Sequence, residues 1–199
     1  KAVDDCIALP PLSQQGLPFA FGTEAAVAGV VSRIRAARRP VILAGIAAVR
    51  ANASASLARL AEALGCPVVV APMAKGVLAE DHPLYAGTLD MACNAFMWEF
   101  LAGCDLIVAA GFDAVELIKP WSLEVPTIHV DSTPNTDQIY PAEVEIVGPV
   151  AAILEALADS CAGEARWSMA EVAAHRNALV TKYYEGRTAG MNKYKALLA

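Results

Sequence analysis

Several residues that could bind a ligand follow directly after largely apolar segments of the sequence. Glycine lets a backbone approach a phosphate closely, arginine binds anions, and carboxylates accept hydrogen bonds from ribose hydroxyls. Residues of these types stand at the ends of the runs 41–44, 105–110 and 127–130. If these runs are strands of one parallel sheet, the residues lie at the edge where such sheets bind ligands. The candidate ligand-binding residues are therefore Gly45, Arg50, Gly111, Phe112, Asp113 and Asp131.

The segment after the first run departs from the usual dinucleotide-binding pattern. Residues 45–52 read GIAAVRAN, so only the first glycine of a GxGxxG motif is present. No acidic residue ends the second apolar run near Ala71 to bind a ribose, so the ordinary NAD fingerprint is missing. Three of the candidates also have a plainer explanation, which we favour. Arg50 would be a solvated surface residue, and Asp113 and Asp131 would cap the turns that follow them.

Other motifs of catalysis and metal binding do not occur in the sequence. GxSxG, HExxH and GxxxxGK[ST] are all missing. The three histidines are isolated from one another, and the five cysteines are scattered, odd in number and without a CxxC pair. This pattern indicates the reduced thiols of a cytoplasmic protein, with Cys66 and Cys104 filling the core, and no metal site. We assign no catalytic residue.

The apolar residues form short runs that alternate with helical stripes. Strands are expected at 41–44, 68–70, 105–110, 127–130 and 144–147. Helices are expected from Thr23 to Pro40, over 54–64 and 93–101, from Val150, and after a Ser168–Glu171 capping box, with a loop over 72–90. The pattern predicts an α/β fold: a Rossmann-like doubly wound parallel sheet of five or six strands with helices on both faces.

Composition excludes several classes of protein. Of 199 residues, 56% are apolar and 18% are charged, so the chain can form a sizeable core. A formal net charge of −6, without a dense basic stretch, argues against nucleic acid as a partner. No apolar run approaches the roughly 20 residues that span a bilayer, so no membrane segment is expected. The low charge predicts apolar surface covered by another domain or subunit, and hence a homo-oligomer.

Six segments of the sequence occur in a characteristic order. They are RPVILAG at 39–45, LAEALGCP at 60–67, PMAKGVLAEDHPLYAG at 72–87, CDLIVAAGFDAVEL at 104–117, TIHVDSTPN at 127–135 and AEVEIVGPVAAILEAL at 142–157. In this order and spacing they resemble the central domain of the thiamine-diphosphate-dependent enzymes of the acetolactate synthase, pyruvate oxidase and benzoylformate decarboxylase group. The resemblance covers about residues 20–160.

The resemblance implies a division of the chain and a role for it. Residues 1–22 would be a linker, 23–160 the central domain, and 161–199 a helical connector to an absent catalytic domain. In this family thiamine diphosphate and Mg²⁺ lie between a pyrimidine-binding and a diphosphate-binding domain, the expected partners in the same parent chain. The family's GDG and NN motifs, which bind diphosphate and Mg²⁺, do not occur here, so we expect no cofactor in this chain. The resemblance thus implies a non-catalytic scaffold domain, excised or processed from a cytoplasmic 2-oxo acid decarboxylase or acetolactate synthase-like enzyme.

Flavin-containing relatives of this family hold FAD at the loops after the first and third strands. The matching positions here are 45–50 and 111–113, with Asp131 at a further strand end. Ile46 and Ala47 stand where those relatives have glycines, and the later loop is shortened as in the flavin-free acetolactate synthases, which argues against FAD. Two alternatives stay open. One is a free-standing FAD- or adenine-dinucleotide-binding module, and the other is an NAD-dependent enzyme of deoxyhypusine-synthase-like fold that would use Lys75 and His82.

Overall fold

A computed structural model describes residues 24–89, 93–136, 139–163 and 165–185. Its centre is a six-stranded sheet in which every pair of neighbouring strands is parallel, in the order β3-β2-β1-β4-β5-β6. The strands are β1 (Pro40–Ala44), β2 (Val68–Val70), β3 (Tyr85–Thr88), β4 (Leu106–Ala110), β5 (Thr127–Asp131) and β6 (Val144–Val147). This topology confirms the predicted doubly wound α/β fold.

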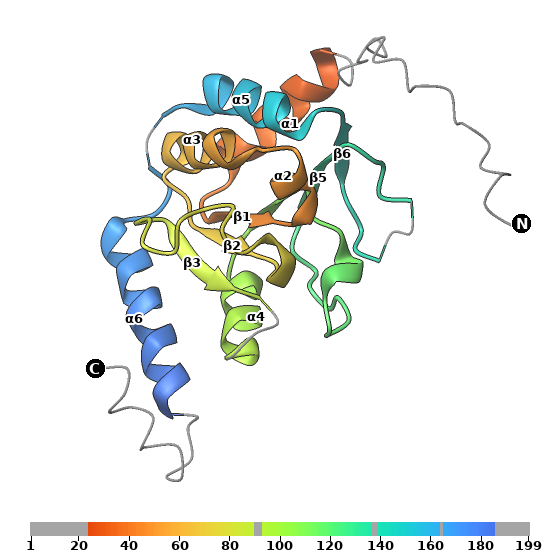
Figure 1. The fold of residues 1–199 in the computed structure, drawn as a ribbon. Helices are drawn as coiled ribbons and strands as arrows, with labels where there is room; N and C mark the ends of the chain where they lie inside the picture. The colour runs from red at the N-terminus through yellow and green to blue at the C-terminus, as the bar shows by residue number, and fades with distance from the viewer. Residues whose placement is uncertain (1–23, 90–92, 137–138, 164, 186–199) are drawn as a thin grey trace, which may run out of the picture.

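Helices cover both faces of the sheet (Figure 1). They are α1 (Glu24–Ala36), α2 (Ile46–Arg50), α3 (Ser54–Leu64), α4 (Asn94–Ala102), α5 (Val150–Cys161) and α6 (Met169–Glu185), with two 3₁₀ turns, η1 (Pro72–Ala74) and η2 (Ala114–Glu116). The helices α1, α2, α3 and α5 lie on one face, and α4 lies on the other with α6. None of the described helices combines the length and the apolar character needed to cross a bilayer.

The core is built around the two central strands. All five residues of β1 and all five of β4 are buried, and the strands pair from Pro40 and Leu106 through Ala44 and Ala110. Strands covered on both faces need apolar side chains on both sides, which explains the uninterrupted runs in the sequence. Over them, α3 packs against α5 and ends at Gly65, whose left-handed backbone (φ 53°) caps the helix.

Three local features differ from the sequence-based expectations. β3 lies inside the predicted loop 72–90, because its sequence YAGT is only four residues long, has Ala and Gly at its centre and forms a strand by pairing with β2. The predicted first loop contains the short helix α2. α1 ends at Ala36 rather than at Pro40, because the Asp105 carboxylate accepts hydrogen bonds from the backbone N–H groups of Arg38 (2.7 Å) and Arg39 (2.8 Å).

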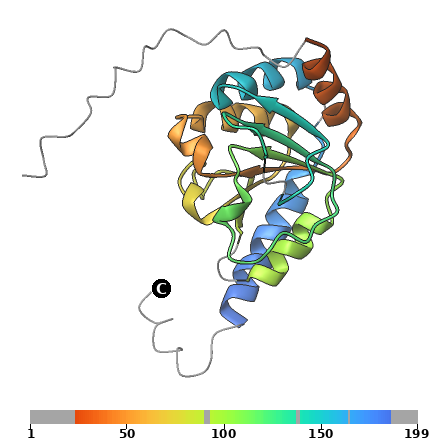
Figure 2. The ribbon, with the colours of Figure 1, turned by 90° about the vertical axis from the view of Figure 1, so that its right-hand side faces the viewer.

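The described part of the predicted connector packs against the domain. The Ser168–Glu171 capping box forms as predicted and begins α6. α6 runs beside α4 (Figure 2) and along β3, one of the two edge strands of the sheet. Its His175 Nε2 bonds the carbonyl oxygen of Ala86 in β3 at 2.9 Å. The division at residue 160 stays a prediction, and the predicted linker 1–22 lies outside the described residues.

Candidate functional site

The carboxyl ends of β1 and β4 form the switch point of the sheet. The strand order reverses between these two neighbours, and open α/β sheets bind ligands there. Gly45 and Gly111 follow the paired residues Ala44 and Ala110, so the fold brings the two predicted glycines side by side. The Gly45 N–H donates to the Ala110 carbonyl at 3.0 Å.

Both glycines are needed because the two loops touch through their backbones. A Cβ atom on Gly45 would collide with the Cα atom of Phe112 and lie 2.5 Å from the Gly111 carbonyl oxygen. Gly111 has φ 58°, and a Cβ there would collide with the backbone nitrogen of Ala48. The Ala47 N–H donates to the Gly111 carbonyl at 3.0 Å. These glycines therefore pack α2 against the β4–η2 loop.

A glutamate that the sequence analysis did not single out completes this contact. The Oε1 atom of Glu116, in η2, accepts a hydrogen bond from the Ile46 N–H at 2.9 Å and a longer one from the Asp113 N–H at 3.4 Å. Burial raises the pKa of the Glu116 carboxyl above its ordinary value of 4.5; the two N–H groups oppose this rise, as does Arg50, whereas the Asp113 carboxylate adds to it. The D-x-x-E spacing of Asp113 and Glu116, a capping box, was the available signal in the sequence.

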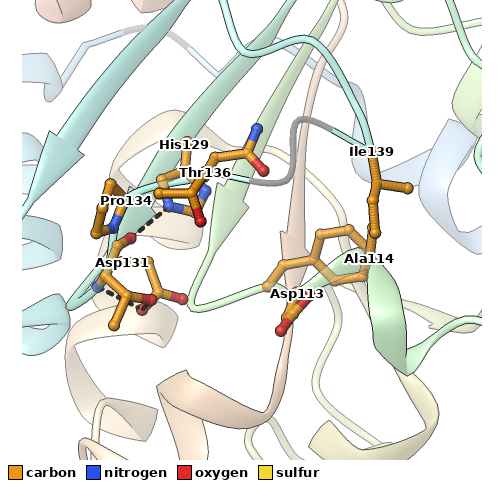
Figure 3. A pocket seen from close by; sticks show the side chains of 10 residues that line it. Asp113, Ala114, His129, Asp131, Pro134, Thr136 and Ile139 are labelled. Carbon is orange, nitrogen blue, oxygen red and sulfur yellow. Dashed lines mark hydrogen bonds between the residues drawn. The ribbon is translucent and has the colours of Figure 1, made fainter.

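Two hollows open beside the switch point, on either side of Asp131. One of about 380 Å³ is lined by Arg50, Asp113 and Asp131, among others, so the fold brings these three predicted residues together. The other, of about 230 Å³, lies between Asp131 and His129 on one side and Asp113 and Ile139 on the other (Figure 3). Phe112 is buried and contributes to the wall of this second hollow.

Both aspartates cap turns, the explanation favoured from the sequence. Asp113 Oδ1 accepts the Val115 N–H at 3.0 Å and begins η2. Asp131 is buried, and its Oδ1 accepts the Ser132 hydroxyl at 3.0 Å and the Thr133 N–H at 3.1 Å. Each carboxylate therefore already fixes the loop that carries it.

A buried imidazole and a buried phenol support the smaller hollow. His129 Nδ1 lies 2.6 Å from the Tyr140 hydroxyl, and its Nε2 lies 2.8 Å from the Thr133 carbonyl oxygen. The Tyr140 hydroxyl also lies 3.2 Å from the Phe112 carbonyl oxygen, and burial raises the pKa of this phenol. The pair ties β5 to the β4–η2 loop. No local sequence signal marks it, because Tyr140 stands in an irregular segment 11 residues from His129.

Lys75 and His82 are not brought together as a catalytic pair. Lys75 Nζ pairs with Glu80 at 3.0 Å, and His82 Nε2 lies 3.3 Å from the Glu62 carboxylate. Neither residue lines the hollows at Asp131. The described residues therefore offer no support for the deoxyhypusine-synthase-like alternative.

The described cysteines and acidic residues also show no reactive cluster. Cys66 and Cys104 are buried, as predicted, and burial raises the pKa of both thiols, that of Cys104 to about 12. Within the described ranges, no group of three or more His, Cys, Asp or Glu side chains could hold a metal ion.

Comparison with known proteins identifies the family. The family model for the central domain of thiamine pyrophosphate enzymes matches residues 27–157. The chain belongs to this family. The family model begins within α1 and ends within α5, so it spans the whole sheet.

Several relatives of this central domain are named as decarboxylases or acetolactate synthases. The chain is 35% identical over 157 residues to the probable 2-ketoarginine decarboxylase of Pseudomonas aeruginosa, covering 76% of this chain and 26% of the relative. It is 34% identical over 131 residues to an acetolactate synthase of Mycobacterium avium, covering 63% and 21%. The chain thus spans about a quarter of the length of the curated relatives it matches.

A solved structure shares the fold of this central domain. It is a thiamine diphosphate-dependent 4-hydroxybenzoylformate decarboxylase of Rhodococcus jostii RHA1, which matches with a TM-score of 0.61 and 23% sequence identity. The match covers 71% of this chain and 28% of that chain. At this level of identity the likeness concerns the fold.

Proposed function

We propose that this central domain is a non-catalytic scaffold within a thiamine-diphosphate- and Mg²⁺-dependent parent enzyme. The parent would be a 2-oxo acid decarboxylase or an acetolactate synthase-like enzyme, in keeping with the names of the relatives. The central domain would hold the pyrimidine-binding and diphosphate-binding domains of the same chain in register. A cytoplasmic location and self-association remain part of this proposal, on the strength of the scattered cysteines and the low proportion of charged residues.

The observation that carries the proposal is the closed switch point. Gly45 and Gly111 bring α2 and the β4–η2 loop into backbone contact, and the Ile46 and Ala47 N–H groups already have protein acceptors. A dinucleotide pyrophosphate requires both space and free N–H groups at this position. FAD therefore does not fit here.

Thiamine diphosphate with Mg²⁺ does not fit the described residues either. Its diphosphate and metal ion require several oxygen ligands gathered in one place. The described acidic side chains form no such group, and Asp113 and Asp131 are engaged with their own loops. We therefore assign this chain no step of the thiamine chemistry, and its contribution to the parent enzyme is structural.

Two measurements on the purified chain test the proposal. Isothermal titration with thiamine diphosphate and Mg²⁺ should give no heat of binding, and the absorption spectrum of the fresh protein should show no flavin band. Micromolar affinity for thiamine diphosphate, or a stoichiometric flavin spectrum, would overturn the scaffold function.

A second candidate function concerns the hollows at Asp131. Asp113 and Asp131 line both hollows, and Arg50 lines the larger of the two, so a small ligand with neighbouring hydroxyl groups could bind there without reaching the closed switch point. Titration with adenosine, compared between the wild type and Asp131→Asn, tests this function. Saturable binding of adenosine that Asp131→Asn abolishes would support this function. Equal binding by the wild type and the variant would exclude it.

A further inference from the structure

The carboxylate of Glu116 stands where an anionic ligand group would otherwise meet the sheet. Two N–H groups from different loops, those of Ile46 after β1 and Asp113 after β4, converge on its Oε1 atom at 2.9 and 3.4 Å. Converging backbone N–H groups at a switch point are the means by which folds of this topology bind phosphate oxygens. In this chain a side chain from η2 supplies the oxygen.

The molecule is shaped to keep this carboxylate in place. A Cβ atom on Gly45 would lie 2.7 Å from Glu116 Oε1, so only a glycine leaves room for it. The Asp113–Glu116 capping box fixes η2 and with it the glutamate backbone.

The carboxylate is not placed for stability alone. Its second oxygen, Oε2, is buried and has no hydrogen-bond partner among the described residues. An unpaired buried oxygen costs free energy, and an apolar side chain would avoid that cost. A position that keeps a costly charge calls for a role that needs the charge.

We infer that Glu116 is a specificity-determining residue, a built-in anion that excludes the phosphates of dinucleotides from the switch point. The inference rests on the proposed function, because it explains how this central domain does without a dinucleotide. A phosphate at this place would have to displace Glu116 and would meet the Asp113 carboxylate beside it. Arg50 favours the charged form of Glu116, and it lines the hollow of about 380 Å³ together with Asp113.

The test compares Glu116→Ala and Glu116→Gln with the wild type, using inorganic pyrophosphate and ADP as probes in isothermal titration. Glu116→Ala removes the oxygen and the charge and should bind pyrophosphate at least about tenfold more tightly than the wild type. Glu116→Gln removes only the charge and should gain less. Glu99→Gln, on an exposed position of α4, changes the net charge equally and should leave binding unchanged.

Amide hydrogen exchange provides the second measurement. The Ile46 N–H should exchange faster in Glu116→Ala than in the wild type, while the Leu57 N–H within α3 should keep its rate in both. Faster exchange of both amides would mean general loosening and would overturn the inference. Equal pyrophosphate affinity in Glu116→Ala and Glu99→Gln would also overturn it, with the scaffold function untouched. A flavin or thiamine diphosphate bound by the wild type would instead overturn the proposed function.

Discussion

The switch point between β1 and β4 and the outer edge of β3 are two places where the sheet leaves backbone groups unpaired. At the switch point these are N–H groups, and a carboxylate, that of Glu116, accepts from Ile46. At the β3 edge and in the loop before it they are carbonyl oxygens, and side-chain N–H groups from α6 bond to them. His175 bonds Ala86, and Arg176 donates to the carbonyls of His82 and Glu80, each at 3.1 Å.

The two regions differ in how closely the backbones approach. At the switch point, backbone packs on backbone, so a Cβ atom added to Gly45 or Gly111 would meet backbone atoms first. At the β3 edge, side chains separate the elements: the rings of Phe100 and His175 contact each other in a tilted arrangement between α4 and α6, with centroids 3.9 Å apart. The switch point is therefore rigid, whereas the α6 contact is adaptable. Substitutions should therefore cost more at the switch point.

The largest expected effect is that of Gly111→Ala. The new Cβ would collide with the Ala48 nitrogen, and the backbone at φ 58° adds strain, so the free energy of unfolding should fall by about 3 to 5 kcal/mol. Gly76→Ala is the matched control, because Gly76 also has a positive φ, 89°, but a methyl group there would meet no atom within 4 Å. Gly76→Ala should lower the free energy of unfolding by about 1 kcal/mol, and urea denaturation measures both variants. If both variants lost the same free energy of unfolding, the backbone at the switch point would be able to move and accommodate the methyl group.

The next effect is that of His175→Ala in α6. The substitution removes the bond to the Ala86 carbonyl and the contact with Phe100, and should cost about 2 kcal/mol. Asn177→Ala, on an exposed position of the same helix, should change stability by less than about 0.5 kcal/mol. Thermal unfolding followed by circular dichroism measures both. If His175→Ala lowered the free energy of unfolding as much as Gly111→Ala, the α6 contact would be no more adaptable than the switch point.

A smaller loss is expected when the switch-point loop loses its anchor on β5. Tyr140→Phe removes the hydroxyl that contacts His129 and the Phe112 carbonyl, which should cost about 1 to 2 kcal/mol. Tyr85→Phe removes a hydroxyl that bonds the Thr88 side chain at 2.8 Å and should cost about 0.5 kcal/mol. Urea denaturation of the two variants, side by side, measures the difference. If Tyr85→Phe lowered the free energy of unfolding more than Tyr140→Phe, the Tyr140 hydroxyl would not anchor the β4–η2 loop.

The smallest effects concern pH, and the two regions should respond in opposite directions. Burial lowers the pKa of His175 below its ordinary 6.5, so the unfolded chain takes up this proton first and stability falls as the pH drops below about 6.5. Burial raises the pKa of Glu116 above 4.5, so the folded chain takes up this proton first and stability rises as the pH falls toward 4.5.

Urea denaturation at pH 7 and pH 5.5 separates these two contributions. Relative to the wild type, His175→Gln should lose less stability on acidification, and Glu116→Gln should lose more. If both variants followed the wild-type pH dependence, neither group would carry the shift that its burial implies.

Much of the fold was predictable because its signals are local. The runs at 41–44 and 68–70, the helical stripe ending at Gly65 and the Ser168–Glu171 capping box all lie where predicted. β3 was missed because its four residues become a strand only through β2. Glu116 was overlooked although its D-x-x-E spacing was visible, because a capping box by itself does not reveal that the carboxylate also reaches α2.

The sequence alone determined the alternation of buried strands and amphipathic helices, the family, and the edge of the sheet at which Gly45, Gly111 and Asp131 gather. The alternation and the edge follow from periodicity and residue types that are local in the sequence, and the family follows from the resemblance of six segments in their order and spacing. Only the tertiary structure decided that the switch point is closed. That outcome depends on atoms 70 residues apart, Ile46 N and Glu116 Oε1, and on two backbones that meet only after the sheet has formed.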